Sequence, residues 1–100
     1  MIRVLHFLPV YAPAWQFGGP VLSVSRLCEG LVQQDVAVRV ITTNAGLPDF
    51  PIDQLGIPQQ VNDVEVIYYP VDMKRRVIRS RALVDALPEH MRWADLLHCG

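Results

Sequence analysis

The sequence predicts an α/β fold with a doubly wound parallel sheet, and three neighbouring segments carry this prediction. Residues 2–10 are almost continuously apolar, which is typical of a strand buried on both faces of a sheet. Residues 21–34 carry apolar side chains at helical spacing, and the β-branched run at 36–42 predicts a second strand. A strand, a helix and a strand with short connections form a βαβ unit, whose crossover is almost always right-handed.

The first helix is predicted to be amphipathic and about four turns long. Pro20 suits its first position, because a proline there gives up no N–H that the helix needs. Asp35 closes the helix. Its apolar residues recur at three- and four-residue spacing, at Val24, Leu27, Cys28, Leu31 and Val32.

The second half of the chain continues the alternation after a long interruption. Prolines, glycines and an asparagine break any period across residues 43–63, which predicts a long surface loop of the kind that is often functional. Residues 64–69 predict a third strand, residues 77–87 a helix that Pro88 breaks or restarts, and residues 93–99 lead into a fourth strand.

This order of elements predicts a Rossmann-like parallel sheet of which the chain supplies an incomplete part, with four strands. Such sheets place their ligands outside the carboxyl ends of the strands. We therefore expect a binding site in the loop at 9–20, in the loop at 43–63 or in the stretch after His98.

Composition limits the classes of protein that the chain can belong to. Its 100 residues, 51% of them hydrophobic and 19% charged, fit one globular domain. A net charge of −1 supplies no general field for nucleic acid. Cys28 and Cys99 lack zinc-site or disulfide-framework spacing, so a reducing cytoplasm is the default location. No apolar stretch approaches the roughly 18–20 residues that span a membrane, and His6 and Pro9 interrupt the opening run, which makes a poor secretory signal.

Gly18 and Gly19, followed by Pro20, stand where a helix is predicted to begin after a buried strand. Bare backbone at such a place lets a phosphate approach the free N–H groups and the positive end of the helix dipole. The pair is not a G-x-G-x-x-G fingerprint, and no P-loop lysine follows it. Spacing alone leaves two readings open, a phosphate site and a glycine pair that only shapes a turn.

Two histidines lie in predicted strands. His6 alternates with apolar neighbours inside the first strand, which favours a satisfied core or sheet-edge residue over a catalytic one. His98 stands at the carboxyl end of the fourth strand, where α/β enzymes place working side chains, although a lone histidine also fits a structural role. Glu65 and Asp95 show no pairing that suggests carboxylate acid/base catalysis.

A basic run precedes and enters the second predicted helix. It could hold an anionic acceptor or contact anionic lipid head groups, at about 1 kcal/mol per basic residue near a membrane. The alternative is a solvated face balanced by nearby acidic residues. The run comprises Lys74, Arg75, Arg76, Arg79 and Arg81.

Four parts of the chain, in order, carry a family likeness: residues 2–13, Gly18-Gly19-Pro20 with its helix, residues 38–44 and residues 94–98. Together they resemble the amino-terminal domain of glycosyltransferase family 4. The resemblance implies a GT-B fold, in which two Rossmann-like domains face a cleft, and retaining transfer of a sugar from a nucleotide-sugar donor without a metal or other cofactor. It also implies that residues 1–100 form a truncated acceptor-side domain and that the carboxyl-terminal donor-binding domain is absent from this chain.

The resemblance carries specific roles onto few residues. It implies that Gly18 and Gly19 approach the donor phosphates, and that His98 matches the first histidine of an H-x-H-like strand end and contacts the acceptor or the sugar. Gly100 stands where many relatives have the second histidine, so no catalytic residue is assigned. The implied partners are a nucleotide-sugar donor and a glycan or lipid-linked acceptor, in polysaccharide biosynthesis on the cytoplasmic side of a membrane. The alternatives are a free-standing phosphate- or nucleotide-binding module without catalysis, and a structural fragment without activity.

Overall fold

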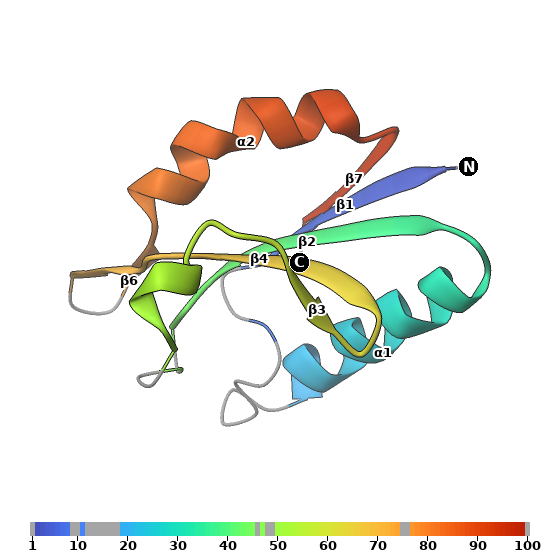
Figure 1. The fold of residues 1–100 in the computed structure, drawn as a ribbon, viewed down its shortest axis with the longest axis horizontal. Helices are drawn as coiled ribbons and strands as arrows, with labels where there is room; N and C mark the ends of the chain where they lie inside the picture. The colour runs from blue at the N-terminus through green and yellow to red at the C-terminus, as the bar shows by residue number, and fades with distance from the viewer. Residues whose placement is uncertain are drawn as a thin grey trace.

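The computed structural model describes residues 2–8, 11, 19–45, 47, 50–74 and 77–99, which fold into an α/β arrangement of three layers. A central sheet lies between two helices, α1 (Gly19–Gln33) and α2 (Arg81–Trp93), on its opposite faces (Figure 1). The sheet has five strands in the order β3-β4-β2-β1-β7. Their bounds are β1 (Arg3–Phe7), β2 (Ala37–Thr43), β3 (Gln59–Val61), β4 (Val64–Tyr69) and β7 (Leu96–Cys99).

Four of these strands run parallel and in register. β2 pairs with β1 on one side and with β4 on the other, and β7 pairs with β1. Arg39 of β2 is the partner of both Leu5 and Glu65, so these three residues share one face of the sheet. The α/β class is confirmed, with a sheet that is mostly parallel.

The fifth strand corrects the prediction of a surface loop at 43–63. β2 extends to Thr43, a short 3-10 helix η2 occupies Ile52–Gln54, and β3 pairs antiparallel with β4. Asn62 and Asp63 join β3 to β4 with positive φ angles of 50° and 68°, as a type I′ hairpin turn requires. Asparagine and aspartate tolerate this backbone, which is why a strand is possible so close to β4.

The predicted helix from Val77 is also corrected. Residues Val77–Arg79 form strand β6, which pairs antiparallel with β5 (Asp72–Lys74) in a separate hairpin. α2 begins later, at Arg81, where the Ser80 hydroxyl oxygen accepts a hydrogen bond of 3.2 Å from the Leu83 backbone N–H. This is a helix amino-terminal cap.

Pro88 lies inside α2 and does not end it, contrary to the sequence prediction. A proline in a helix removes one N–H and leaves the carbonyl four residues earlier without its partner. That carbonyl belongs to Val84, which is 59% exposed, and Pro88 is exposed as well. Water can therefore hydrate the carbonyl of Val84, and the helix continues to Trp93.

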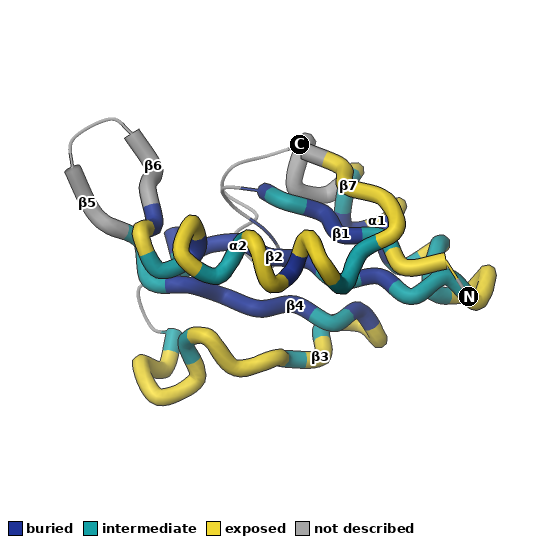
Figure 2. Tube along the Cα trace, turned by 90° about the horizontal axis from the view of Figure 1, so that it is seen from above, coloured by how far each residue is buried: buried dark blue, intermediate teal, exposed yellow. Residues whose placement is uncertain are grey.

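Each face of the sheet has its own apolar cluster. Val40, Val66 and Tyr68 pack with Cys28 of α1, whereas Ile41 and Ile67 pack with Leu83 of α2. Buried residues gather in β4, β2 and β1, and the segment before β3 is exposed (Figure 2). The alternation along β2 and β4 thus divides their side chains between the two helices.

Two buried titratable groups on the α1 face, Cys28 and Tyr68, are uncharged. Burial raises the pKa of the Cys28 thiol to about 11 and that of the Tyr68 hydroxyl to about 12, so both groups keep their protons at neutral pH. Cys28 is a free thiol in the core, and its raised pKa gives it the character of a small apolar residue. Leu27, which the helical spacing places with the apolar residues, is 48% exposed at the border of this face.

Replacing Ser80 with alanine should lower the free energy of unfolding by about 1 kcal/mol, because the Leu83 N–H then loses its acceptor at the start of α2. Urea unfolding followed by circular dichroism measures the change. Ser23→Ala, on an exposed position of α1, is the matched control and should change stability by less than about 0.5 kcal/mol. Equal stabilities of the two variants would contradict the capping role.

Candidate functional site

Three polar side chains lie on one face of the sheet, near the carboxyl ends of its parallel strands. His6 of β1 is the register partner of His98 of β7 and of Val40 of β2. Thr42 follows Val40 by two residues, so it lies on the same face, one step nearer the edge. α1 covers this face, and because it joins two parallel strands it begins at the same edge, at Gly19.

His6 and Thr42 are buried polar residues of this face. His6 is 2% exposed and Thr42 is fully buried, and neither the two imidazole nitrogens nor the hydroxyl oxygen has a partner among the residues described. Leaving such a buried polar group unpaired costs about 1–3 kcal/mol. Few buried polar groups in folded proteins remain unpaired. These three atoms can therefore still form hydrogen bonds that no described residue provides.

His6 is in contact with His98. The centroids of the two rings are 4.9 Å apart, with planes tilted by 57°, and His98 is exposed. Burial lowers the pKa of His6, and the nearby charge of His98 lowers it further. His6 is therefore neutral at neutral pH, with one nitrogen that donates a hydrogen bond and one that accepts.

The predicted site residues fall at different places in the fold. His98 lies in the last described strand at the carboxyl edge, as its position predicts. His6 is buried as predicted, but no residue that the structure describes forms a hydrogen bond with its ring. Gly19 begins α1, whereas Gly18 lies outside the described residues.

Two members of the basic run lie in the hairpin that follows β4, and Arg81 begins α2. Lys74 ends β5 and Arg79 ends β6, whereas Arg75 and Arg76 lie outside the described residues. Within the described parts of the chain, neither helix has the length and apolar character needed to cross a bilayer. No cluster of three or more histidine, cysteine or acidic side chains suited to a metal ion occurs in these parts either.

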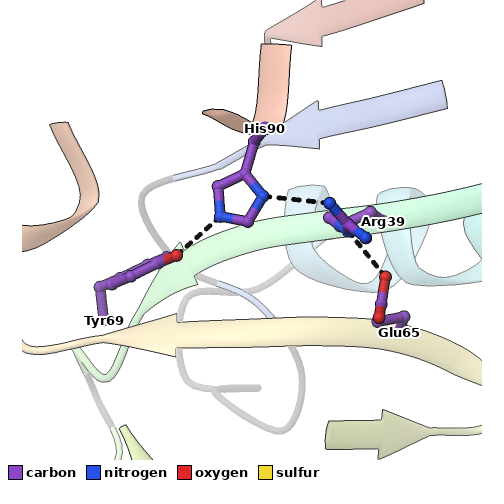
Figure 3. A network of polar contacts seen from close by, with 4 residues as sticks. All are labelled: Arg39, Glu65, Tyr69 and His90. Carbon is purple, nitrogen blue, oxygen red and sulfur yellow. Dashed lines mark hydrogen bonds and ion pairs between the residues drawn. The ribbon is translucent and has the colours of Figure 1, made fainter. Parts of the chain in front are cut away.

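A second polar cluster lies on the other face of the sheet and is fully connected (Figure 3). Arg39 Nε donates to Glu65 Oε2 at 2.8 Å, and Arg39 NH1 lies 3.3 Å from His90 Nδ1. His90 Nε2 lies 2.7 Å from the Tyr69 hydroxyl oxygen, and the Arg39 guanidinium lies 4.1 Å from the centroid of the Trp93 ring. These contacts join α2 to β2 and β4.

The chemistry of Arg39 fixes the tautomer of His90. A guanidinium only donates hydrogen bonds, so Nδ1 must accept and Nε2 must carry the proton that it donates to Tyr69. Burial and then the charge of Arg39 lower the pKa of His90, against smaller opposing effects of Glu89 and Glu65. Both ring nitrogens are used within the protein, so we assign this cluster to holding α2 on the sheet.

Glu65 and Asp95, the two carboxylates considered in the sequence, each lie beside an arginine. Glu65 pairs with Arg39 as described, and Asp95 Oδ2 accepts from the Arg3 backbone N–H at 2.9 Å and lies 3.8 Å from Arg3 Nε.

The site role of Thr42 and the polar cluster around His90 were not predicted from the sequence. A signal for Thr42 was present, since it ends an alternation in which Val38 and Val40 face the core. A polar residue that continues an apolar face at the carboxyl end of a parallel strand is a candidate ligand contact. His90 gave no comparable signal, because its partners come from distant strands.

Comparisons with protein-family models, with curated proteins and with solved structures find no match for this chain.

The free energy of unfolding should fall as the pH is lowered through about 6.5, the usual pKa of histidine. The folded chain holds the pKa values of His6 and His90 below that value, so the unfolded chain binds more protons in this range. The contribution of the neutral histidines is present above the unfolded pKa and is lost progressively toward the lowered folded pKa. Urea unfolding at a series of pH values measures this dependence.

His90→Gln tests the part that the cluster contributes. A glutamine amide can accept from Arg39 and donate to Tyr69 without titrating, so this variant should show a flatter loss of stability on acidification. The same pH dependence in the variant and in the natural chain would contradict a neutral, buried His90.

Proposed function

We propose that this chain is the acceptor-side, Rossmann-like domain of a retaining glycosyltransferase of the GT-B type. It acts with a second domain that binds the donor, and transfers a sugar from a nucleotide-sugar donor to a glycan or lipid-linked acceptor. One observation carries the proposal: α1 begins at the carboxyl ends of the parallel strands, where α/β proteins bind their ligands, and its first turn holds no acidic side chain. The ordered likeness to glycosyltransferase family 4 and the mostly parallel sheet support it.

The start of α1 is the part of this edge suited to a phosphate. α1 has 15 residues and no acidic side chain in its first turn, so nothing in that turn neutralises the positive end of its dipole. In the proposed enzyme, the backbone at Gly18 and Gly19 approaches the donor diphosphate. Retaining transfer without a metal needs such groups to stabilise the charge of the leaving diphosphate, and the basic side chains would come from the second domain.

The remaining roles follow the position of each residue. His98, exposed at the end of β7, contacts the acceptor or the transferred sugar. The β5/β6 hairpin follows the carboxyl end of β4. In the proposed enzyme, Lys74, Arg75, Arg76 and Arg79 bind an anionic acceptor or lipid head groups. The proposal places the enzyme in the cytoplasm, in peripheral contact with the inner face of a membrane.

The alternative function is a module that binds phosphate or a nucleotide without catalysis. The absence of acidic residues from the first turn of α1 favours it as much as it favours the enzyme, because the helix start alone suffices for an anion. The two functions differ in affinity, since a module must bind tightly without a second domain.

Titrating the ¹⁵N-labelled chain with uridine diphosphate and guanosine diphosphate tests both functions. For half of a cleft, we expect shifts of the amide signals at the start of α1 with a Kd of about 1 mM. Gly19→Asp should remove these shifts by repelling the diphosphate, while the carboxylate itself suits the helix start. Gln33→Glu adds the same charge at the opposite end of α1 and should leave binding unchanged.

The outcomes separate the possibilities. Saturable binding at about 1 μM by this chain alone would support the module. Amide signals at the α1 start that do not move, or that move equally in Gly19→Asp, would contradict a phosphate role for this edge in either function.

A further inference from the structure

We propose that His6 and Thr42 form a distinct subsite that binds an uncharged hydroxyl group of the ligand, apart from the phosphate-binding start of α1. The identity of this group as a sugar hydroxyl rests on the proposed function. The chemistry of the subsite rests on its own atoms.

The three polar atoms belong to residues of two adjacent strands, β1 and β2. His6 pairs in register with Val40, and Thr42 is the next residue of β2 on that face. His6 and Thr42 are therefore diagonal neighbours on adjacent parallel strands. A strand spacing of about 4.8 Å and a rise of about 3.3 Å per residue put their Cα atoms roughly 8 Å apart, a separation that one hydroxyl-bearing ligand can span. Both residues are at least nine-tenths buried, so a bond formed there is shielded from water.

The electrostatics of this face favour a neutral ligand. Its buried neighbours Tyr11, Cys28 and Tyr68 are uncharged, and burial raises the pKa of each. His6 is neutral because burial and His98 lower its pKa. An anion bound here would lose its hydration without gaining a buried counter-charge, which is far more costly than burying a hydroxyl.

The donor and acceptor pattern matches a hydroxyl. A neutral imidazole offers one N–H and one bare nitrogen, and the threonine hydroxyl both donates and accepts. A ligand hydroxyl also does both, so one such group can pair with His6 and Thr42 together. A sugar presents several hydroxyl groups, whereas inorganic phosphate presents mainly charged acceptors.

The proposal places the entry to this subsite beside His98. His98 is exposed, and its ring lies against that of the buried His6. In this proposal, a ligand reaches His6 by displacing the exposed His98 ring.

Thr42→Val distinguishes an unused hydroxyl from a structural one, because valine keeps the shape of threonine and removes the hydroxyl. In the ligand-free chain, this variant should raise the midpoint of thermal unfolding by about 4 °C or more, since an unpaired buried oxygen is lost. Thr43→Val is the matched control. The Thr43 hydroxyl accepts from the Ala45 N–H at 3.2 Å, so its removal should lower the midpoint.

The same variants are titrated with methyl α-glucopyranoside, which is uncharged, and with inorganic phosphate, each followed by amide signals. The glucoside should shift the amide signals of His6 and Thr42. In Thr42→Val and in His6→Phe, the glucoside concentration that gives half of the maximal shift should be about tenfold higher. Phosphate should shift only the start of α1, equally in all three chains.

Three results would overturn the subsite. They are a lowered unfolding midpoint in Thr42→Val, glucoside shifts that both variants retain, and glucoside shifts that are absent from the natural chain. If phosphate still binds at α1 in any of these cases, the subsite alone fails and the proposed function stands. Loss of phosphate shifts from the natural chain, with the glucoside response intact, contradicts the phosphate role and leaves the subsite.

Discussion

The in-register parallel pairing of β2 with β1 and β4 is the constraint on which the rest of the structure depends. β2 is hydrogen-bonded on both sides, and its side chains alternate between the two helices. Because the alternation has a period of two, a shift of one residue would exchange the faces. Val40 would then face α2, Arg39 would enter the apolar cluster beneath α1, and both polar clusters would be lost.

The two polar clusters differ in how they use their hydrogen-bonding atoms. On the α2 face, each nitrogen of His90 has a partner, and Arg39 is shared between Glu65 and His90. On the α1 face, neither nitrogen of His6 has a partner among the described residues. A network whose atoms are all paired strengthens a fold, whereas unpaired buried atoms weaken it. This contrast is the physical ground for assigning the first cluster to stability and the second to binding.

α2 shows how several weak contacts determine the position of one helix. Ser80 caps its start, Leu83 enters the core and His90 reaches the strands near its end. Trp93 lies over Arg39 at the last residue of the helix. Contacts at both ends allow α2 to tolerate Pro88 in its middle, next to the exposed residue Val84.

The elements with local signals could be predicted from the amino-acid sequence alone. The apolar run of β1, the helical spacing in α1 and the β-branched run of β2 predicted their types, and Pro70 follows the end of β4 as expected. The tertiary structure decided what depends on partners distant in the chain. β3 exists because β4 offers it an edge, and β6 forms because β5 pairs with it, against the prediction of a loop and a helix. His6 and His98 meet because β7 pairs with β1, from opposite ends of the sequence. Periodicity reports which face of an element is apolar, but the packing of the whole chain selects the neighbour of each strand, and with it the side chains that meet at the carboxyl edge.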